Sequence, residues 1–466
     1  MTDQTLAADY SKLVADQRAY FKAGHTRPTA WRIEQLNAIK RMIDESRDAM
    51  YEALWHDLRR NRIDADLMDV DYNIREAEHA LKHLHGWMKP VREPTPLLME
   101  PGHVRVRRDP FGVTLIIGAW NEPYMLTIAP LVAAIAAGNT AVVKPSEIAE
   151  ATARQLAEMV PKYLDPEAVS VVLGGVPETT ALLAQKWDLI FFTGSPPVGK
   201  IIHQAAAKNL TPAVLELGGK NPTIVHSSAN IRTAARRIAF SRYINSGHIC
   251  TAPDHVLVWP EVKDELVAEL KQAIADFYGA DPKQSPDYGR IINRKNFDRL
   301  AGFLGSENGT IAAGGQADPD QLYIAPTVLV DVPVDSPIMQ EEVFGPILPV
   351  LEIDSEQAVI DWVNERPQPL GLYVFAEDED VAERILAATN SGDACVNDCS
   401  IHPLIPELPF GGVGNSGMGK YHGRYGFEAF TNARGVLYHS ARLDPGVKYP
   451  PYAEHTHERE VMEKLL

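Results

Sequence analysis

Cysteine is scarce in this chain, with three residues among 466. Three thiols cannot build a disulfide framework, and none stands in the paired Cys and His spacing of a structural zinc site, so we expect no metal site. Cys395 and Cys399 lie four residues apart and are typical of core and loop thiols in a reducing compartment. The surroundings of the third cysteine, Cys250, are more informative.

The chain also has no excess of basic residues and no long apolar run. The chain has 62 Asp and Glu against 45 Lys and Arg, a formal net charge of −17, which argues against nucleic-acid binding because such partners need a basic surface. The amino terminus lacks the basic start and apolar run of a signal peptide. Residues 126–138, the longest weakly polar stretch, are too short to span a bilayer, and residues 455–466 are charged. We therefore expect a cytoplasmic protein without a membrane anchor.

The hydrophobic pattern predicts an α/β protein. Apolar residues at three- and four-residue spacing predict helices over residues 6–88, with breaks at Pro28 and residues 61–64 and with Trp55 in the core. Apolar strands then alternate with helices, which predicts a doubly wound parallel sheet covered on both faces. Its strands are expected at residues 112–120, 140–143, 169–173, 189–192 and 213–217.

A second alternation of strands and helices begins after Gly219 and predicts a second α/β domain. Its strands are expected at residues 255–258, 327–330, 347–353, 371–375 and 394–397. The alternating side chains of residues 104–108, Val-Arg-Val-Arg-Arg, predict an exposed ribbon strand at a sheet edge or a subunit contact. The tail strand at residues 435–438 has the same edge-like character.

Cys250 lies in the stretch Tyr-Ile-Asn-Ser-Gly-His-Ile-Cys-Thr-Ala-Pro, between a predicted helix and a predicted strand. A thiol in such a turn can be ionised by the helix dipole and its neighbours, and only the thiolate attacks a carbonyl carbon. The alternative is a buried structural cysteine, which a lone cysteine commonly is.

Polar residues end three of the five strands of the first sheet, at the edge where such sheets bind ligands. Asn121 could donate its amide to an oxyanion, or only form the turn before Pro123. Lys144 and Glu147 could hydrogen-bond ribose hydroxyls, or form a solvated ion pair. Glu216 lies between two leucines, where burial would raise its pKa toward that of a general base; the alternative is a helix cap or a salt bridge.

Two further stretches fit a ligand contact. Residues 192–200 join a strand to a helix through Gly194 and Ser195, and a glycine turn at a helix N-terminus can hold phosphate, although this is not the G-x-G-x-x-G fingerprint. The carboxylates of Glu341 and Glu342, before Val-Phe-Gly-Pro, are candidates for a ligand contact or a helix cap.

Together these motifs resemble the aldehyde dehydrogenase superfamily over about residues 6–450. Six motifs occur in the order and spacing of that family: W-N-x-P at Asn121, K-P-S-E at Lys144, F-T-G-S at Ser195, L-E-L-G-G-K at Glu216, N-S-G-x-x-C at Cys250 and E-E-V-F-G-P at Glu342. Residues 174–180, 250–254, 287–292 and 409–419 resemble its class 3 branch, which takes fatty and aromatic aldehydes.

The resemblance implies oxidation of aliphatic or aromatic aldehydes to carboxylic acids with NAD, with NADP tolerated, through a thiohemiacetal and a thioester on Cys250. Asn121 would hold the oxyanion and Glu216 would activate the hydrolytic water. The implied cofactor residues are Trp120, Lys144, Ser146, Glu147, Gly194, Ser195, Gly218, Glu342 and Phe344, and the implied substrate-pocket residues are Glu122, His248, Ile249 and Thr251. A CoA-acylating dehydrogenase and a catalytically silent member of the fold are the alternatives.

The same resemblance implies a division of the chain and a homodimer. The cofactor-binding domain would comprise residues 1–90 and 110–217, and the catalytic domain residues 218–419. Residues 91–109 and 420–445 would form bridging strands that pair two subunits, and residues 446–466 a tail.

Three positions depart from the family pattern. His248 stands where Gln is usual, and Pro196-Pro197 remove two backbone donors at a helix entry. Glu122 stands where an aromatic residue is common, beside the expected substrate tunnel. It either points inward and favours aldehydes with hydroxyl or amino groups, or turns away to pair with an arginine of residues 105–108.

Overall fold

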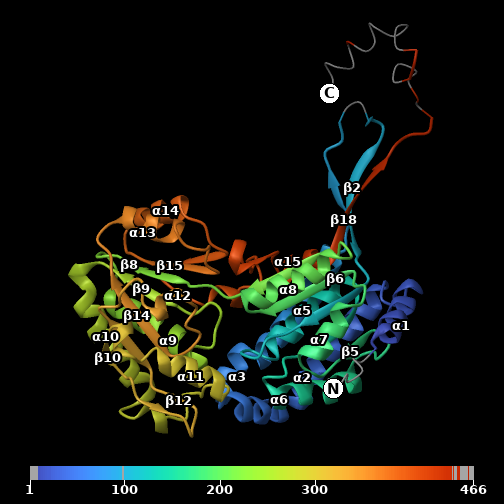
Figure 1. Ribbon diagram of the computed structural model, residues 1–466. Coiled ribbons are helices and arrows are strands. Elements are labelled where there is room, and N and C mark those ends of the chain that lie inside the picture. Colours follow the sequence, from blue (N-terminus) through green and yellow to red (C-terminus); the bar gives the residue numbers. More distant parts are fainter. Residues whose placement is uncertain (1–8, 97–98, 443, 445–448, 452–459, 461–466) are drawn as a thin grey trace, which may run out of the picture.

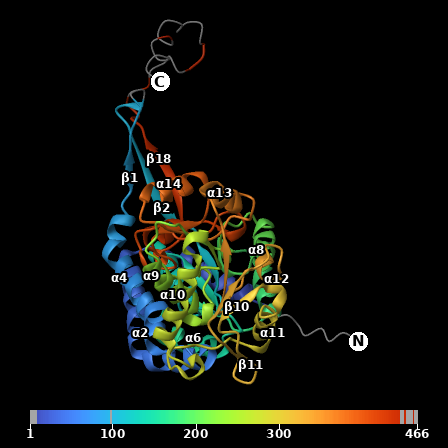
Figure 2. The ribbon, with the colours of Figure 1, turned by 90° about the vertical axis from the view of Figure 1, so that its left-hand side faces the viewer.

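The computed structural model describes residues 9–96, 99–442, 444, 449–451 and 460, and has two lobes and a projecting ribbon (Figure 1). One lobe holds a six-stranded sheet and the N-terminal helices, and the other holds a seven-stranded sheet. A three-stranded ribbon stands away from both lobes in two perpendicular views (Figure 2). The predicted α/β class is confirmed.

Four helices open the described chain: α1 (Ser11–Lys22), α2 (Thr29–Leu58), α3 (Arg62–Met68) and α4 (Val70–Trp87). Both predicted breaks are confirmed, since Pro28 precedes α2 and the Asn61 side chain accepts a hydrogen bond from the Asp64 N–H (2.9 Å) to cap α3. Trp55 is 44% exposed under the Arg59 guanidinium, so the prediction of a core contact is wrong. Residues 6–8 of the predicted helical region lie outside the described residues.

The first sheet has the strand order β17-β7-β6-β3-β4-β5. Its five parallel strands are β3 (Val113–Ile117), β4 (Thr140–Lys144), β5 (Val169–Val171), β6 (Leu189–Gly194) and β7 (Ala213–Leu217), which confirms the five predictions. The sixth strand, β17 (Gly417–Met418), adds antiparallel to β7 with Gly417 opposite Glu216. A segment 200 residues away in sequence therefore closes on the strand end that carries Glu216.

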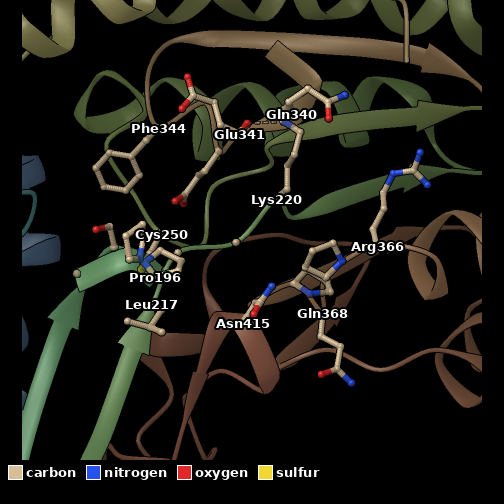
Figure 3. A pocket seen from close by; sticks show the side chains of 18 of the residues that line it. Pro196, Leu217, Lys220, Cys250, Gln340, Glu341, Phe344, Arg366, Gln368 and Asn415 are labelled. Atoms are coloured by element: carbon tan, nitrogen blue, oxygen red, sulfur yellow. Dashed lines mark hydrogen bonds between the residues drawn. The ribbon is translucent and has the colours of Figure 1, made fainter. Parts of the chain in front are cut away.

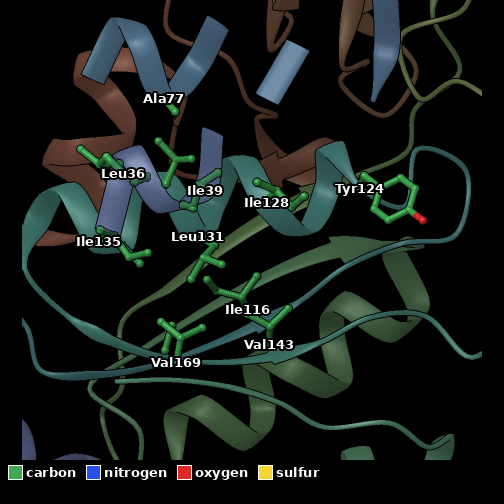
Figure 4. Close-up of a cluster of buried hydrophobic side chains, with 14 of the residues drawn as sticks. Leu36, Ile39, Ala77, Ile116, Tyr124, Ile128, Leu131, Ile135, Val143 and Val169 are labelled. Carbon is green, nitrogen blue, oxygen red and sulfur yellow. The ribbon is translucent and has the colours of Figure 1, made fainter. Parts of the chain in front are cut away.

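Helices cover both faces of this sheet: α5 (Met125–Ala137), α6 (Glu150–Tyr163), α7 (Val176–Leu183) and α8 (Pro196–Ala207). Every residue of α5 is buried, and Leu131 packs between β3 and the N-terminal helices (Figure 4). After α7, Trp187 turns inward and donates its indole N–H to the Leu182 carbonyl (2.7 Å). The close packing of these helices against the sheet holds the ends of its strands in place.

The second sheet has the order β10-β13-β14-β9-β8-β15-β16. Its strands are β8 (Pro222–Val225), β9 (His255–Val258), β10 (Thr310–Ala313), β13 (Thr327–Val330), β14 (Ile347–Glu352), β15 (Gly371–Phe375) and β16 (Asp393–Val396). The lobe's helices are α9 (Ile231–Tyr243), α10 (Pro260–Tyr278), α11 (Arg294–Gly302), α12 (Pro337–Gln340), α13 (Glu356–Asn364) and α14 (Glu379–Ala388), beside the short hairpin of β11 (Ala317–Asp318) and β12 (Tyr323–Ile324). All five predicted strands are confirmed; β8 and β10, four residues each, were missed.

The projecting ribbon consists of β1 (Val91–Glu93), β2 (His103–Pro110) and β18 (Thr431–Tyr438), the last preceded by α15 (Gly423–Ala429). β2 and β18, expected as two separate edges, pair with each other along their whole length, from Pro110 opposite Thr431 to His103 opposite Tyr438. No helix among the described residues is long and apolar enough to cross a membrane.

Candidate active site

Two cavities meet at Cys250. The larger, of about 1110 Å³, is lined by both lobes and includes the end of β7, the start of α8 and residues 339–344. Figure 3 shows Phe344, Cys250 and Pro196 on one side of it and Arg366 on the other. The smaller cavity, of about 60 Å³, has a mainly apolar wall. Cys250 lines both, so a ligand in one cavity and a ligand in the other would meet at the thiol.

A left-handed turn after α9 presents Cys250. Asn245, Ser246 and Gly247 have φ angles of 51°, 50° and 75°, and a Cβ at Gly247 would collide with the Gly345 carbonyl. The Asn245 amide holds the turn by donating to the carbonyl oxygens of Asn121 (2.9 Å) and His248 (3.1 Å). Asn245 and Gly247 suit this backbone, because Asn and Gly adopt positive φ angles more readily than most residue types.

Asn121, after β3, is fixed close to this turn. Its Nδ2 donates to the His248 carbonyl (3.0 Å) and to Glu122 Oε2 (3.3 Å), and its own carbonyl accepts from Arg60. Arg60 forms a buried ion pair with Asp69, whose second oxygen accepts two backbone N–H groups at the start of α5 (2.9 and 2.8 Å). The bond to the His248 carbonyl fixes the amide, and the N–H that meets Glu122 in the longer bond is the one that can turn to an oxyanion.

The thiol itself is not ionised by its surroundings. Burial raises the pKa of Cys250 well above its usual value, and the carboxyl groups of Glu122, Glu216 and Glu342 raise it further. The expectation that the helix dipole would promote ionisation is wrong, because Cys250 follows the C-terminal end of α9, where the dipole is negative. A basic group or an added positive charge is needed to generate the thiolate.

The three carboxyl groups around the thiol also favour their acid forms. Burial, with Asp393 adding to it, raises the pKa of Glu216 well above its usual value, while Lys420 acts in the opposite direction. Burial raises the pKa values of Glu122 and Glu342 to about 8. Glu216 Oε1 is buried without a hydrogen-bond partner in the part of the chain that the structure describes, and so is available to a bound water.

The larger cavity fits a nicotinamide cofactor. Glu342 closes on Gly218 so tightly that a Cβ at Gly218 would overlap its carboxylate, and Trp120 and Phe344 meet edge to face with centroids 5.3 Å apart. Ser195 precedes α8, and Lys200, which sequence reasoning missed, lines the same wall. These residues offer a carboxylate for a ribose, aromatic walls for a ring and a cation for a phosphate.

Comparison with known proteins assigns the chain to a protein family. The model of the aldehyde dehydrogenase family matches residues 2–436. The chain belongs to the aldehyde dehydrogenase family. Aldehyde dehydrogenase family 3 member B1 of Homo sapiens is 46% identical over 436 residues, 93% of each chain, and the dimeric NADP-preferring aldehyde dehydrogenase of Mus musculus is 44% identical over 446 residues, 95% of this chain and 98% of that protein. The substrate-bound structure of Staphylococcus aureus AldH has a TM-score of 0.95 and 41% identity, covering 98% of this chain and 99% of that one.

The predicted superfamily and its class 3 branch are thereby confirmed. This aldehyde dehydrogenase is an oxidoreductase that converts aldehydes to carboxylic acids with NAD or NADP as the cofactor. The structure gathers most of the implied site residues around its two cavities. The larger is lined by Trp120, Asn121, Gly194, Ser195, Glu216, Gly218, Glu342 and Phe344, and the smaller by Glu122, Ile249 and Thr251.

Four implied residues of this aldehyde dehydrogenase line neither cavity. Lys144, Ser146 and Glu147 lie at the same edge of the first sheet, with Lys144 Nζ 2.6 Å from Glu147 Oε2. His248 was expected in the substrate pocket, but it is buried against two aromatic rings, with its ring centroid 5.0 Å from that of Trp120 and 5.9 Å from that of Phe344. The expectation that it lines the substrate pocket is therefore wrong. Burial lowers its pKa to about 3, which keeps the ring neutral.

Glu122 of this aldehyde dehydrogenase points inward. It is buried, lines the smaller cavity and is hydrogen-bonded to Asn121. The alternative of pairing with a ribbon arginine is wrong, because Arg108 pairs with Glu428 (3.1 Å) and Arg105 lies over Tyr438. The cation that acts on Glu122 is Arg60.

Tyr421 is a site residue of this aldehyde dehydrogenase that the sequence reasoning missed. It is buried, lines the larger cavity, and its hydroxyl has no hydrogen-bond partner among the described residues. The signal in the sequence that could have found it is an aromatic residue two positions after the glycine-rich loop at residues 410–419, part of which forms β17 beside the end of β7. Its hydroxyl can therefore bond water or substrate near Glu216, whose charge raises its pKa in addition to burial.

Proposed function

We propose that this aldehyde dehydrogenase works through a covalent intermediate on Cys250, with each step assigned to a residue of this chain. The observation that carries the proposal is the position of Cys250 at the junction of the two cavities. The overall reaction consumes an aldehyde, NAD(P)⁺ and water, and yields a carboxylic acid, NAD(P)H and a proton.

Cys250 releases its thiol proton, the one that appears among the products, and the thiolate adds to the aldehyde carbon. The resulting oxyanion accepts hydrogen bonds from the Asn121 amide and the Cys250 backbone N–H, and the hydrogen on that carbon then leaves as a hydride, which gives the thioester. The bound oxidised nicotinamide supplies the hydride acceptor and a positive charge. In its ionised form, Glu216 then takes a proton from the water that hydrolyses the thioester. The raised pKa makes this carboxylate a stronger base than an exposed one, and its Oε1 has no other hydrogen-bond partner among the described residues. Such a base disfavours the CoA-acylating alternative, in which a thiol replaces the water.

The cofactor would extend from this junction across the edge of the first sheet. Glu342 and Phe344 would contact the nicotinamide ribose, Ser195 and Lys200 the pyrophosphate, and Lys144 with Glu147 the adenosine ribose. Because Glu147 accepts bonds from ribose hydroxyls but repels a 2′-phosphate, we infer a preference for NAD with NADP tolerated. Pro196 and Pro197, the first two residues of α8, lack N–H groups, which weakens the phosphate contact.

We also infer a cytoplasmic homodimer that pairs through the ribbon. The outer edges of β1 and β18 have no strand partner among the described residues, and Val91 and Leu437 are each 50% exposed. The division into a cofactor domain (residues 1–90 and 110–217), a catalytic domain (residues 218–419) and bridging strands (residues 91–109 and 420–445) is part of this proposal. Most of the tail at residues 446–466 lies outside the described residues.

Replacement of the nucleophile tests the mechanism. Cys250→Ala should reduce NAD(P)H formation from hexanal or benzaldehyde to background while cofactor binding, measured by quenching of intrinsic fluorescence, persists. Cys395→Ala, which removes a half-buried thiol of the second lobe, is the matched control and should retain turnover. Turnover by Cys250→Ala above background would contradict the assignment, and formation of acid without added CoA separates hydrolysis from acyl transfer.

A further inference from the structure

The smaller cavity has an ionisable group in an otherwise mainly apolar wall. Most of that wall comes from apolar side chains of α3, α5, α9 and residues 401–410. Among its described lining residues, Glu122 is the only one with a carboxyl group, and it shares the cavity with the Cys250 thiol. A wall built for a plain hydrocarbon chain gives no reason to bury a carboxyl group there.

The position of Glu122 relative to the reacting carbon follows from Asn121. One hydrogen bond of the Asn121 Nδ2, to the His248 carbonyl (3.0 Å), orients the amide, and the other reaches Glu122 Oε2 (3.3 Å). Because the His248 carbonyl holds one N–H, the N–H that now meets Glu122 is the proposed donor to the aldehyde oxygen. Glu122 therefore stands beside that oxygen, and the substituent of the substrate nearest to it is the one on C2, the carbon next to the carbonyl.

Glu122 also has unused hydrogen-bonding capacity. Both terminal nitrogens of Arg60, the cation that acts on it, are already engaged, one by Asp69 and one by the Asn121 carbonyl. Burial favours the neutral acid by raising its pKa to about 8, and a neutral acid can donate one hydrogen bond and accept others. A hydroxyl on C2 would satisfy this group, whereas a methylene there would leave it buried and unsatisfied.

We propose that Glu122 makes this enzyme selective for short 2-hydroxyaldehydes. The proposal rests on the proposed attack of Cys250 on C1, and C2 with its hydroxyl passes unchanged into the acid product. Short chains are favoured because a cavity of about 60 Å³ has room for on the order of four or five water-sized atoms. Discrimination should be substantial, since a site that hydrogen-bonds a substrate hydroxyl rejects the analogue without it more strongly than an apolar pocket rejects a methylene.

A position series on the unmodified enzyme tests this without any variant. The probes are propanal, 2-hydroxypropanal and 3-hydroxypropanal, with kcat/KM referred to the free carbonyl form of each. We expect 2-hydroxypropanal to exceed propanal by about tenfold or more and also to exceed 3-hydroxypropanal, whose hydroxyl lies one carbon too far. Equal values for propanal and 2-hydroxypropanal, or a higher value for 3-hydroxypropanal, would overturn the proposal.

Variants then assign the preference to Glu122. Glu122→Met keeps the length of the side chain and should bring the ratio of 2-hydroxypropanal to propanal down to about one, whereas Glu122→Gln, which still forms hydrogen bonds, should retain most of it. Ser400→Ala removes a hydroxyl from the wall of the same cavity and should leave the ratio unchanged. An unchanged ratio in Glu122→Met, or an equal fall in Ser400→Ala, would overturn the role of Glu122. If the wild type oxidises hexanal or benzaldehyde but none of the three short aldehydes, the proposal for Glu122 fails and the proposed function stands. If it oxidises none of these aldehydes faster than Cys250→Ala, the proposed function itself fails.

Discussion

Replacing Glu122 by Gln should stabilise this protein, and more so at pH 7 than at pH 5. The pKa of the buried carboxyl is raised from 4.5 to about 8. The folded protein therefore keeps a proton that the unfolded chain releases above pH 4.5, and the free energy of unfolding falls as the pH rises from there toward about 8. Gln has nearly the same shape as Glu and keeps an oxygen that accepts from the Asn121 amide. Its side chain does not titrate in this pH range, so its burial carries no such pH-dependent cost.

The cost of keeping the proton is about 1.4 kcal/mol for each pH unit above the unfolded pKa. It amounts to about 3 kcal/mol at pH 7 and about 1 kcal/mol at pH 5. With an unfolding entropy of about 2.1 cal/mol/K per residue, a chain of 466 residues should gain about 3 °C in Tm at pH 7 and about 1 °C at pH 5.

Thermal unfolding of the wild type and of Glu122→Gln at both pH values measures this gain. Glu52→Gln, which changes an exposed carboxylate on α2, is the control and should leave Tm within error at both pH values. A Glu122→Gln variant with no gain at pH 7, or with the same gain at pH 5, would refute the conclusion that Glu122 is buried as an acid beside the thiol.

Three further predictions concern catalysis, cofactor choice and assembly. Glu216→Gln should keep a pre-steady-state burst of NADH while steady turnover falls by about a hundredfold or more, and an equal loss of both would mean that Glu216 mainly activates the thiol. Glu147→Gln should narrow the preference for NAD over NADP by up to about tenfold in kcat/KM, whereas a wild type at least about tenfold better with NADP would contradict the assignment of the ribose contact. Leu437→Asp should convert a dimer to a monomer in light scattering at micromolar protein with its circular dichroism unchanged, and a monomeric wild type would refute the ribbon as the interface.

The sequence by itself determined the elements and their order. Strands such as β9 and β15 are short apolar runs between helical patterns, and local hydrophobic periodicity is enough to locate them. The motifs around Asn121, Glu216 and Cys250 identified the family because each keeps its spacing along the chain. β8 and β10 escaped although they are as long as β9, because β8 begins with a proline, which argues against a buried strand, and β10 is half exposed and has no run of large apolar residues.

Only the tertiary structure decided how these residues act on one another. The pairing of β17 with β7 closes the glycine-rich loop over Glu216 and brings Tyr421 to the site, a contact between segments 200 residues apart. The raised pKa of Cys250 comes first from burial and then from three carboxyl groups on different elements, so no local motif encodes it. His248 and Glu122 lie next to site residues in sequence, yet one is packed behind aromatic rings and the other faces the cavity. Burial and electrostatic interaction depend on distances through space, and those distances are set by packing between the lobes.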